Sequence, residues 1–598
     1  MNEAARRISL LREHMKPGKI DAYLVPTADY HESEYVGDHF KCREYITGFT
    51  GSAGTALITR DWAGLWTDGR YFIQAAAQLA GSGVELMKQG QPNVPTLEEY
   101  LETHMPEGGI LGFDGRSVNA RMGENLERRL AAKNVSLACT EDLIGEIWED
   151  RPRLSEEPLW VLDERYAGRP AANKIAALRA EMKYAGASVH LLTTLDDIMW
   201  LLNVRGGDIP HNPVALCYVA VTEWDLLLFI NEKIVPPPVL DYLIRLGVEL
   251  QPYQHVYDYV SGLRDERVLL EKSKVNYLIL HDLDASNTVI DRMNPTVMAK
   301  AVKNDIEIAN MRAAHVKDGV AMVKFIYWLK HEVGHTKISE CDAADYLDQL
   351  RREQGAMDES FDTISAYGAN AAMCHYHAEA KSCAMLEPKG FYLVDSGGQY
   401  LEGTTDVTRT IALGPLTDEE REHYTLVLIS MLRLGNVRFL SGCSGLSLDY
   451  VAREPFWQRG LDFNHGTGHG VGYLLNVHER PVGIRYRVVP ERQDSAPFAP
   501  GMICSDEPGI YIEGSHGIRT ENMVCCQRAE KTEYGQFLRF EFLTLVPIDV
   551  EPLRLELMED EDIRHLNEYH RLVYDELAPL LTAEEAGWLR EATRPVTR

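Results

Sequence analysis

The sequence lacks any hydrophobic run long enough to cross a membrane. No segment approaches the roughly 20 apolar residues that a membrane-spanning helix needs. The first twelve residues are charged and have no apolar centre, so the sequence predicts no signal peptide. The ten cysteines are scattered and show no CxxC spacing, which is typical of reduced thiols in a cytosolic protein. We therefore expect a cytoplasmic protein that does not bind membranes.

Positive charge is also scarce. The chain has 61 basic and 90 acidic residues, which gives a net charge of −29. This charge repels a phosphate backbone, and no basic stripe offsets it, so we expect no nucleic-acid binding. With 598 residues the chain is too long to fold around a single hydrophobic core. A typical size of about 150 residues per domain predicts roughly three to four domains.

The apolar pattern predicts two α/β units in the first half of the chain. The first unit begins with a helix near Glu3–Met15, and the polar, proline-containing stretch Arg151–Pro158 is a candidate linker. The second unit has a helix at Ala171–Ala185. Strands at Ala215–Val221 and Trp224–Ile230 are expected to form a hairpin in it.

Helices with one apolar face mark the second half of the chain. A long helix is expected near Asp305–Val333, and another begins at Thr417, where Glu420 completes a capping box. The chain ends in a helical tail. The residues expected to share a face are Ala309, Ala313, Val316, Val320, Val323 and Tyr327 in the long helix, and Leu566, Tyr569, Val573 and Leu577 in the tail.

Acidic and histidine residues that can carry chemistry are concentrated between His375 and Glu521. A short apolar strand ends at Asp395, and a glycine-containing turn returns the chain to Asp406, so a hairpin can place these two carboxylates side by side. Three further segments follow, each with an acidic or histidine residue at a strand-like position. They are HGTGHGVG at 465–472, DEPG at 506–509 and GIRTEN at 517–522.

Four carboxylates on converging strands repel one another and require cations. Two divalent ions carry four positive charges, which match the four negative charges of the acidic residues, and a neutral histidine can complete the site. Such a donor set suits manganese, iron, cobalt or zinc and argues against a thiolate zinc site. The residues concerned are Asp395, Asp406, His469, Glu507 and Glu521.

In this order the segments resemble the pita-bread metallopeptidase family, specifically aminopeptidase P of the long, three-domain type. The stretches GFTGSAGT at 48–55 and WTDGRYF at 66–72 resemble that family's N-terminal domain. LNVRG at 202–206 and HNP at 211–213 resemble its middle domain, so the resemblance covers nearly the whole chain.

The resemblance implies an α/β and α+β multidomain fold. It predicts two creatinase-like N-terminal α/β domains at residues 1–150 and 151–304. A pita-bread catalytic domain at 305–548 and a helical C-terminal extension at 549–598 would follow. A homodimer formed through the catalytic and C-terminal region is also implied, and the apolar face of the tail could serve it or pack within its own chain.

The resemblance further implies a metallo-aminopeptidase that removes the first residue of peptides with proline in second position. Asp395 would bind one ion, His469 and Glu507 the other, and Asp406 and Glu521 both. Two divalent ions, manganese before zinc, cobalt or iron, would lower the pKa of a water between them, and the resulting hydroxide would attack the Xaa-Pro bond. Glu507 would pass a proton toward the leaving proline nitrogen.

Two further histidines match family residues that orient the substrate and stabilise the tetrahedral intermediate, namely His375 in CHYH and His478 in NVHE. The chain departs from the family after His375, because His377 and Glu379 stand where a short pair such as Ala-Pro is expected. This departure leaves the fine shape of the substrate pocket open, as it does the role of His465.

Two arginines allow alternative interpretations. Arg70 in WTDGRYF resembles an arginine that reaches toward the substrate, although it could instead pair with Asp68. Arg519 could brace the neighbouring Glu521 without taking part in the chemistry.

Four related functions compete with this hypothesis. A prolidase has the same ligands but cleaves only Xaa-Pro dipeptides, and two α/β units ahead of the catalytic one favour aminopeptidase P. A methionine aminopeptidase would leave the N-terminal half unexplained. Because all five ligand positions carry residues that can bind a metal, both a metal-free creatinase and a non-catalytic pita-bread binding module are disfavoured.

Overall fold

The computed structural model describes residues 2–490 and 492–598. The chain folds into two compact units. Unit 1 comprises Met1–Leu162 and Pro170–Thr296, and unit 2 comprises Asp163–Arg169 and Val297–Arg598. Within the described residues, no helix is both long and apolar enough to cross a membrane.

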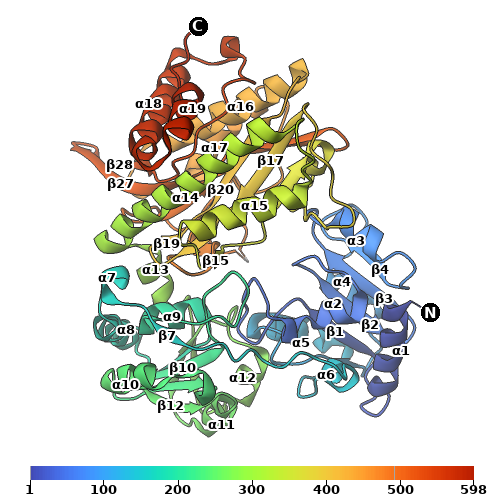
Figure 1. Ribbon diagram of the computed structural model, residues 1–598. Helices are drawn as coiled ribbons and strands as arrows, with labels where there is room; N and C mark the ends of the chain where they lie inside the picture. Colours follow the sequence, from blue (N-terminus) through green and yellow to red (C-terminus); the bar gives the residue numbers. More distant parts are fainter. Residues whose placement is uncertain (1, 491) are drawn as a thin grey trace. The chain divides into compact units, whose positions relative to one another are not determined.

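The first part of unit 1 is a six-stranded sheet covered by helices (Figure 1). Its order is β4-β3-β2-β1-β5-β6. Strand β2 is antiparallel to β1 and β3, and the outer strands β4, β5 and β6 are added in parallel. The predicted first helix is α1 (Glu3–Met15). The other elements are β1 (Ala22–Pro26), α2 (Cys42–Thr47), β2 (Thr55–Thr59), β3 (Ala63–Thr67), α3 (Phe72–Gln78), β4 (Glu85–Lys88), α4 (Leu97–His104), β5 (Ile110–Gly112), α5 (Ala120–Leu130), β6 (Ser136–Ala138) and α6 (Leu143–Ile147).

The second part of unit 1 repeats this design with the order β12-β11-β10-β8-β13-β14. The predicted hairpin is present, because β10 and β11 pair antiparallel from Cys217–Ile230 to Val221–Leu226. Its elements are β7 (Trp160–Val161), α8 (Ala171–Ala185), β8 (Val189–Leu192), α9 (Leu195–Leu202), β9 (Val204–Arg205), β10 (Cys217–Thr222), β11 (Leu226–Ile230), α10 (Pro237–Arg245), β12 (Glu249–Pro252), α11 (His255–Gly262), β13 (Arg267–Leu270), α12 (Tyr277–Asp282), β14 (Thr288–Asp291) and the start of α13 (Pro295–Ala301).

Unit 2 packs long helices over antiparallel sheets (Figure 1). The largest sheet has the order β21-β28-β27-β24-β22-β23, and a smaller one has the order β16-β17-β20. The helices are α7 (Glu164–Ala167), α14 (Asp305–Glu332), α15 (Glu340–Glu353), α16 (Asp418–Gly435), α17 (Gly445–Trp457), α18 (Asp560–Leu577) and α19 (Ala583–Ala592). The strands are β15 (Asp358–Glu359), β16 (Ile364–Tyr367), β17 (Phe391–Ser396), β18 (Gly398–Tyr400), β19 (Gly403–Thr404), β20 (Val407–Ala412), β21 (Arg438–Leu440), β22 (Gly468–Gly470), β23 (Glu479–Ile484), β24 (Ile503–Asp506), β25 (Gly509–Ile512), β26 (His516–Arg519), β27 (Asn522–Thr532) and β28 (Gly535–Phe542).

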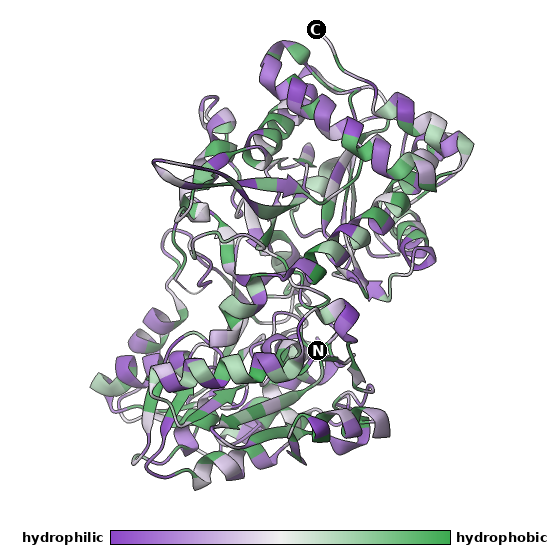
Figure 2. Cartoon of the chain, turned by 90° about the vertical axis from the view of Figure 1, so that its left-hand side faces the viewer, coloured by the Kyte–Doolittle hydropathy of each residue, from purple (hydrophilic) through white to green (hydrophobic). Residues whose placement is uncertain are grey.

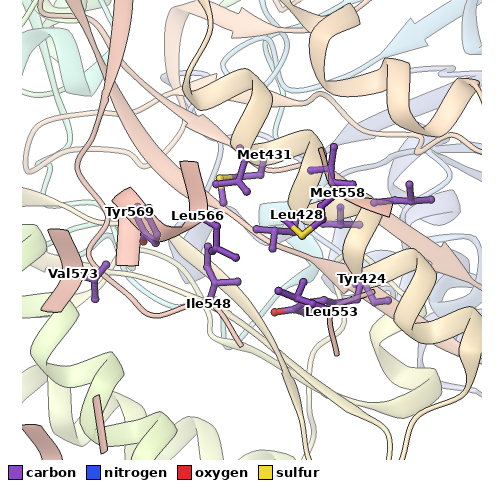
Figure 3. Close-up of a cluster of buried hydrophobic side chains, with 14 of the residues drawn as sticks. Tyr424, Leu428, Met431, Ile548, Leu553, Met558, Leu566, Tyr569 and Val573 are labelled. Carbon is purple, nitrogen blue, oxygen red and sulfur yellow. The ribbon is translucent and has the colours of Figure 1, made fainter. Parts of the chain in front are cut away.

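The apolar residues of these elements form the cores of the units. In Figure 2 many strands are green, whereas the helices that cover them carry both green and purple residues. Helix α18 contributes Leu566, Tyr569 and Val573 to a cluster with residues of α16, including Leu428 and Met431 (Figure 3). The apolar face predicted for the tail is therefore buried within its own chain.

The face predicted for α14 is wrong in its first half. Ala309 and Ala313 are exposed, whereas Ile308 and Met311 are buried. In the second half, Val320 and Val323 are buried as predicted, whereas Tyr327 is only half-buried. The capping box at the start of α16 is present as predicted.

Candidate metal centre

The β17–β20 hairpin positions the first two predicted ligands. Asp395 in β17 lies directly opposite Thr408 in β20, and Asp406 immediately precedes β20. Both carboxylates are buried, with 9% and 4% of their surfaces exposed. The expected hairpin thus carries both acids into the interior of unit 2.

Three further ligand candidates come from the neighbouring sheet. His469 lies in β22, Glu507 follows β24, and Glu521 precedes β27. The Glu507 N–H donates to Thr467 O at 2.8 Å, and the Glu521 N–H donates to Thr408 O at 3.1 Å. The second bond joins this sheet to the hairpin.

Close backbone packing explains one glycine of the HGTGHGVG segment. A Cβ atom on Gly468 would lie 2.0 Å from the carbonyl oxygen of Ser505. Only glycine therefore allows β22 to approach β24 at this point. The adjacent His469 N–H donates to Ser505 Oγ at 3.0 Å, which holds the histidine in place.

The side chains of the five residues converge. Nε2 of His469 lies 3.4 Å from Asp406 Oδ2 and 3.4 Å from Glu507 Oε1. Ligand atoms of Asp406, His469 and Glu521 all lie within 4.8 Å of one another. Nδ1 of His469 is 3.0 Å from Gly470 O, so it acts as the donor and leaves Nε2 to face the carboxylates.

The acidic residues carry more buried negative charge than their protein partners balance. Burial raises the pKa of Asp395 to about 6, with the charge of Asp406 adding to the effect, although Arg519 opposes it. Burial also raises the pKa of Glu521 well above its usual value, and Asp406 and Asp395 add to that rise. Within the described residues, Asp395 Oδ1 is buried and has no hydrogen-bond partner. Divalent cations fit these residues, because they would supply the missing positive charge and coordination.

The pKa values of His469 and Glu507 are shifted by each other's surroundings. Burial acts to lower the pKa of His469, but the Asp406 carboxylate raises it to about 9. Burial acts to raise the pKa of Glu507, but the charges of His469 and His465 hold it below its usual value. His469 and Glu507 therefore interact electrostatically, as their separation of 3.4 Å implies.

Two other histidines, His478 and His465, lie beside the proposed ligands. A third, His375, lies in a separate segment. The ring of His478 lies 4.3 Å from that of His469, edge to face. Nε2 of His465 forms a hydrogen bond of 2.9 Å with Tyr511 Oη. Its Nδ1 lies 4.0 Å from Glu507 Oε2. His375 is exposed in the segment 373–385 that follows β16.

Arg519 differs from the sequence-based expectation. Its Nη2 atom lies 2.5 Å from Asp395 Oδ2, and its Nη1 atom donates to Tyr511 Oη at 2.6 Å. It therefore pairs with Asp395 and not with Glu521. Sequence reasoning did not identify Tyr511 or Thr408, which donates to Glu521 Oε2 at 2.6 Å. Their only signal is position, since each lies on a strand that borders a ligand.

Arg70 belongs to unit 1, where it pairs with its sequence neighbour. Its Nε and Nη2 atoms donate to the two carboxylate oxygens of Asp68, each at 2.8 Å. This bidentate pair is the structural alternative that the sequence left open.

Known families match four segments of the chain. Residues 309–528 match metallopeptidase family M24, and residues 536–596 match the C-terminal region of that peptidase. Residues 7–147 and 150–307 each match a creatinase/prolidase N-terminal domain.

Whole proteins and solved structures are similar as well. A probable Xaa-Pro aminopeptidase P of Aspergillus fumigatus is 38% identical over 99% of this chain and 93% of its own. Aminopeptidase P2 of Arabidopsis thaliana is also 38% identical, over 99% and 88%. The X-prolyl aminopeptidase of Caenorhabditis elegans, described as a cytosolic enzyme with a di-nuclear active site, has a TM-score of 0.94 at 35% identity and covers 100% of both chains. An Xaa-Pro dipeptidase of Bacillus anthracis shares the fold of 63% of this chain and 99% of its own, with a TM-score of 0.51 at 24% identity.

The fold and these similarities agree with the resemblance found in the sequence. The peptidase part has the pita-bread fold, and the two creatinase-type domains precede it. Because similarity at this level extends over 99% of the sequence, the chain belongs to metallopeptidase family M24, in the long form with two creatinase/prolidase N-terminal domains.

Proposed function

We propose that this protein is a dinuclear Xaa-Pro aminopeptidase, which releases the first residue of peptides whose second residue is proline. The observation that carries the proposal is the buried convergence of Asp406, His469 and Glu521 within 4.8 Å, with Glu507 beside them. Relatives named Xaa-Pro aminopeptidase P over the whole length support the reaction class. We assign the catalysis to residues 305–548, with domains at 1–150 and 151–304 before them and the extension 549–598 after them.

The proposed ligands of two divalent ions are Asp395, Asp406, His469, Glu507 and Glu521. When bound, such ions supply a nucleophilic water at neutral pH and polarise a carbonyl oxygen. Carboxylate oxygens with one imidazole favour manganese, and they also accommodate zinc, cobalt or iron. No cysteine lies among these residues, which disfavours a thiolate site.

Glu507 is the proposed proton carrier. Its Oε1 atom lies 3.4 Å from His469 Nε2, beside the other proposed ligands, where a carboxylate can accept a proton. Ser505 Oγ donates to Glu507 Oε1 at 3.1 Å and fixes its orientation. From this position the carboxyl group can deliver the proton to the proline nitrogen as the bond breaks.

His478 and His375 are the proposed substrate-orienting residues. The ring of His478 packs 4.3 Å from that of His469, which keeps it beside the ligands. An imidazole N–H at this point can donate to the carbonyl oxygen on which negative charge develops. His375 would contribute a second donor, and the resemblance proposes Arg70, which also pairs with Asp68, as a further substrate-binding residue.

The proposed site is compatible with an Xaa-Pro bond. An Xaa-Pro bond has no N–H, and proline fixes φ near −65°. A site that recognises carbonyl oxygens with histidines does not need the missing proton. We therefore propose peptides with proline in second position as substrates, and we place the enzyme in the cytoplasm, as its Caenorhabditis elegans relative is described.

The test compares kcat/KM for Arg-Pro-Pro, Arg-Ala-Pro and Arg-Pro with manganese supplied. We expect Arg-Pro-Pro to be cleaved fastest, by at least about tenfold, which corresponds to roughly 1.4 kcal/mol. A faster dipeptide would replace the proposal with a prolidase. Equal rates for Arg-Ala-Pro and Arg-Pro-Pro would disprove the proline specificity.

A further inference from the structure

Two cysteines face each other across a short antiparallel contact in unit 2. Ser339 forms an antiparallel bridge with Met385, and the Glu340 N–H donates to Ala384 O at 3.0 Å. Cys341, in the first turn of α15, lies two residues after Ser339, and Cys383 lies two residues before Met385.

The two thiols already contact each other. They are joined by a side-chain hydrogen bond, and Cys341 Sγ also lies 3.6 Å from Ala378 O. Both cysteines are partly exposed, whereas Cys217 and Cys504 are buried. A small-molecule reagent can therefore reach this pair.

The surroundings favour Cys383 as the reacting thiol. The Cys341 thiol and backbone N–H at the start of the 14-residue helix α15 hydrogen-bond to Cys383 and lower the pKa of its thiol. Burial raises the pKa of the Cys341 thiol to about 12. A thiol of lowered pKa next to a second cysteine is the arrangement found in reversible redox sites.

The pair lies at the end of the segment 373–385, which carries His375. The buried carboxylate of Glu340, next to Cys341, fastens this segment. It accepts from Tyr376 Oη at 2.8 Å and from the Ala384 N–H at 2.7 Å. It also accepts from Asn370 Nδ2 at 2.9 Å. The start of α15 thus holds both ends of the segment.

We propose that Cys341 and Cys383 are a redox modification site, which forms a reversible disulfide by exchange with a small-molecule disulfide and thereby displaces the His375 segment. The Cys383 thiolate attacks one sulfur of the external disulfide and releases one thiolate. Cys341 then loses its proton and attacks the Cys383 sulfur, and the second external thiolate leaves. The protein pair is oxidised by two electrons, and the external disulfide is reduced to two thiols.

Forming the bond draws the two sulfurs closer than their present contact. A shift of about 1 Å in a positioning segment can lower a rate by about a hundredfold. Because the pair is linked to His375 only through the segment, we expect a smaller decrease in kcat/KM, about tenfold. This expectation about activity rests on the proposed function, whereas formation of the disulfide does not.

The experiment incubates the reduced, manganese-loaded full chain in glutathione buffers of increasing oxidised fraction. Free thiols are then blocked, and peptide mapping by mass spectrometry identifies the bonds. We expect a Cys341–Cys383 crosslink, with kcat/KM for Arg-Pro-Pro falling about tenfold and recovering fully with a thiol reductant. Cys341→Ser and Cys383→Ser should abolish both changes, and the control Cys443→Ser should retain both.

Each failure has a separate meaning. Absence of the Cys341–Cys383 crosslink, with other cysteines modified instead, overturns the site. A crosslink that forms without any loss of activity overturns the coupling to the His375 segment. A loss of activity that persists in Cys383→Ser but disappears in Cys374→Ser assigns the effect to Cys374 and overturns the proposal. Lack of activity in the fully reduced protein instead refutes the proposed function and leaves the crosslink test valid.

Discussion

At the level of single residues, Asp406 lies close to several of the other proposed ligands. It lies 3.4 Å from His469 Nε2, within reach of Glu521, and its charge raises the pKa of Asp395 and Glu521. We expect Asp406→Ala to lose bound metal and activity together, with kcat/KM reduced at least about 10²–10³-fold. Elemental analysis and a peptidase assay on the same sample measure both.

The matched control is Glu402→Ala. Glu402 lies in the turn of the same hairpin but pairs with Lys317 Nζ at 2.8 Å. Its variant should retain both metal and activity. Full activity in Asp406→Ala would refute the ligand assignment.

His478 is predicted to act on the substrate and not on the metal. We expect His478→Ala to keep its metal content but to lower kcat about 10²–10³-fold, the usual cost of one transition-state donor. His375→Ala should behave in the same way. His331→Ala is the control, because His331 lies exposed on α14 and its Nδ1 bonds to Tyr327 O of the same helix. Loss of metal from His478→Ala would place it among the ligands.

The sequence predicts the residues of this centre better than it predicts their partners. Motif position identified His469 and Glu507, and the structure brings them within 3.4 Å. It could not reveal that Arg519 turns toward Asp395, because arginine has several acidic neighbours and the choice depends on strand packing. The same holds for Tyr511, whose role depends on contacts between β25 and β26.

At the level of elements, α14 shows where periodicity fails. Its first half buries His315 and Asp318, which hydropathy counts as surface residues. Asp318 pairs with Arg351 Nε at 2.7 Å and accepts from Tyr400 Oη at 3.0 Å, so its burial is compensated. A pattern based on apolar residues therefore selected Ala309 and Ala313, which lie on the exposed side.

Helix α18 offers a test of packing. Leu566 is 0% exposed and packs against α16, whereas Leu572 on the same helix is 38% exposed. We expect Leu566→Ala to reduce the free energy of unfolding by about 2–5 kcal/mol, because it leaves a cavity. Leu572→Ala should change it by less than about 0.5 kcal/mol. Urea unfolding followed by tryptophan fluorescence compares them, and equal effects would contradict the packing described for the tail.

At the level of the whole molecule, the order of the domains was predictable because each has its own motif. Residues 48–55 and 202–206 indicated two creatinase-type domains, and both domain matches are present. The surface through which the protein would form a dimer was harder to predict from the sequence. The apolar face of the tail, which we considered for a dimer, is used inside the chain instead.

We predict that the protein is a homodimer, associated through another face of unit 2. Helix α17 exposes Tyr450 and Trp457, whose rings lie 6.0 Å apart, and Trp457 also contacts Tyr486. Exposed aromatic groups of this kind are typical of interfaces. Light scattering at micromolar concentration should give twice the chain mass. Tyr450→Glu should shift it toward the monomer, and Tyr534→Glu, exposed on the turn between β27 and β28, should not.

The spacing of the proposed ligands along the chain has a consequence for biosynthesis. Asp395 lies on the hairpin of β17 and β20, whereas Glu521 precedes β27, more than a hundred residues later. At about 5–20 residues per second, a ribosome needs on the order of ten seconds to bridge that interval. During it the nascent chain presents Asp395 and Asp406 without their later partners, so an incomplete polypeptide cannot retain both ions. If the proposed ligands hold the ions, we expect metal loading to follow synthesis of the last ligand strand, when the N-terminal domains have already emerged from the ribosome.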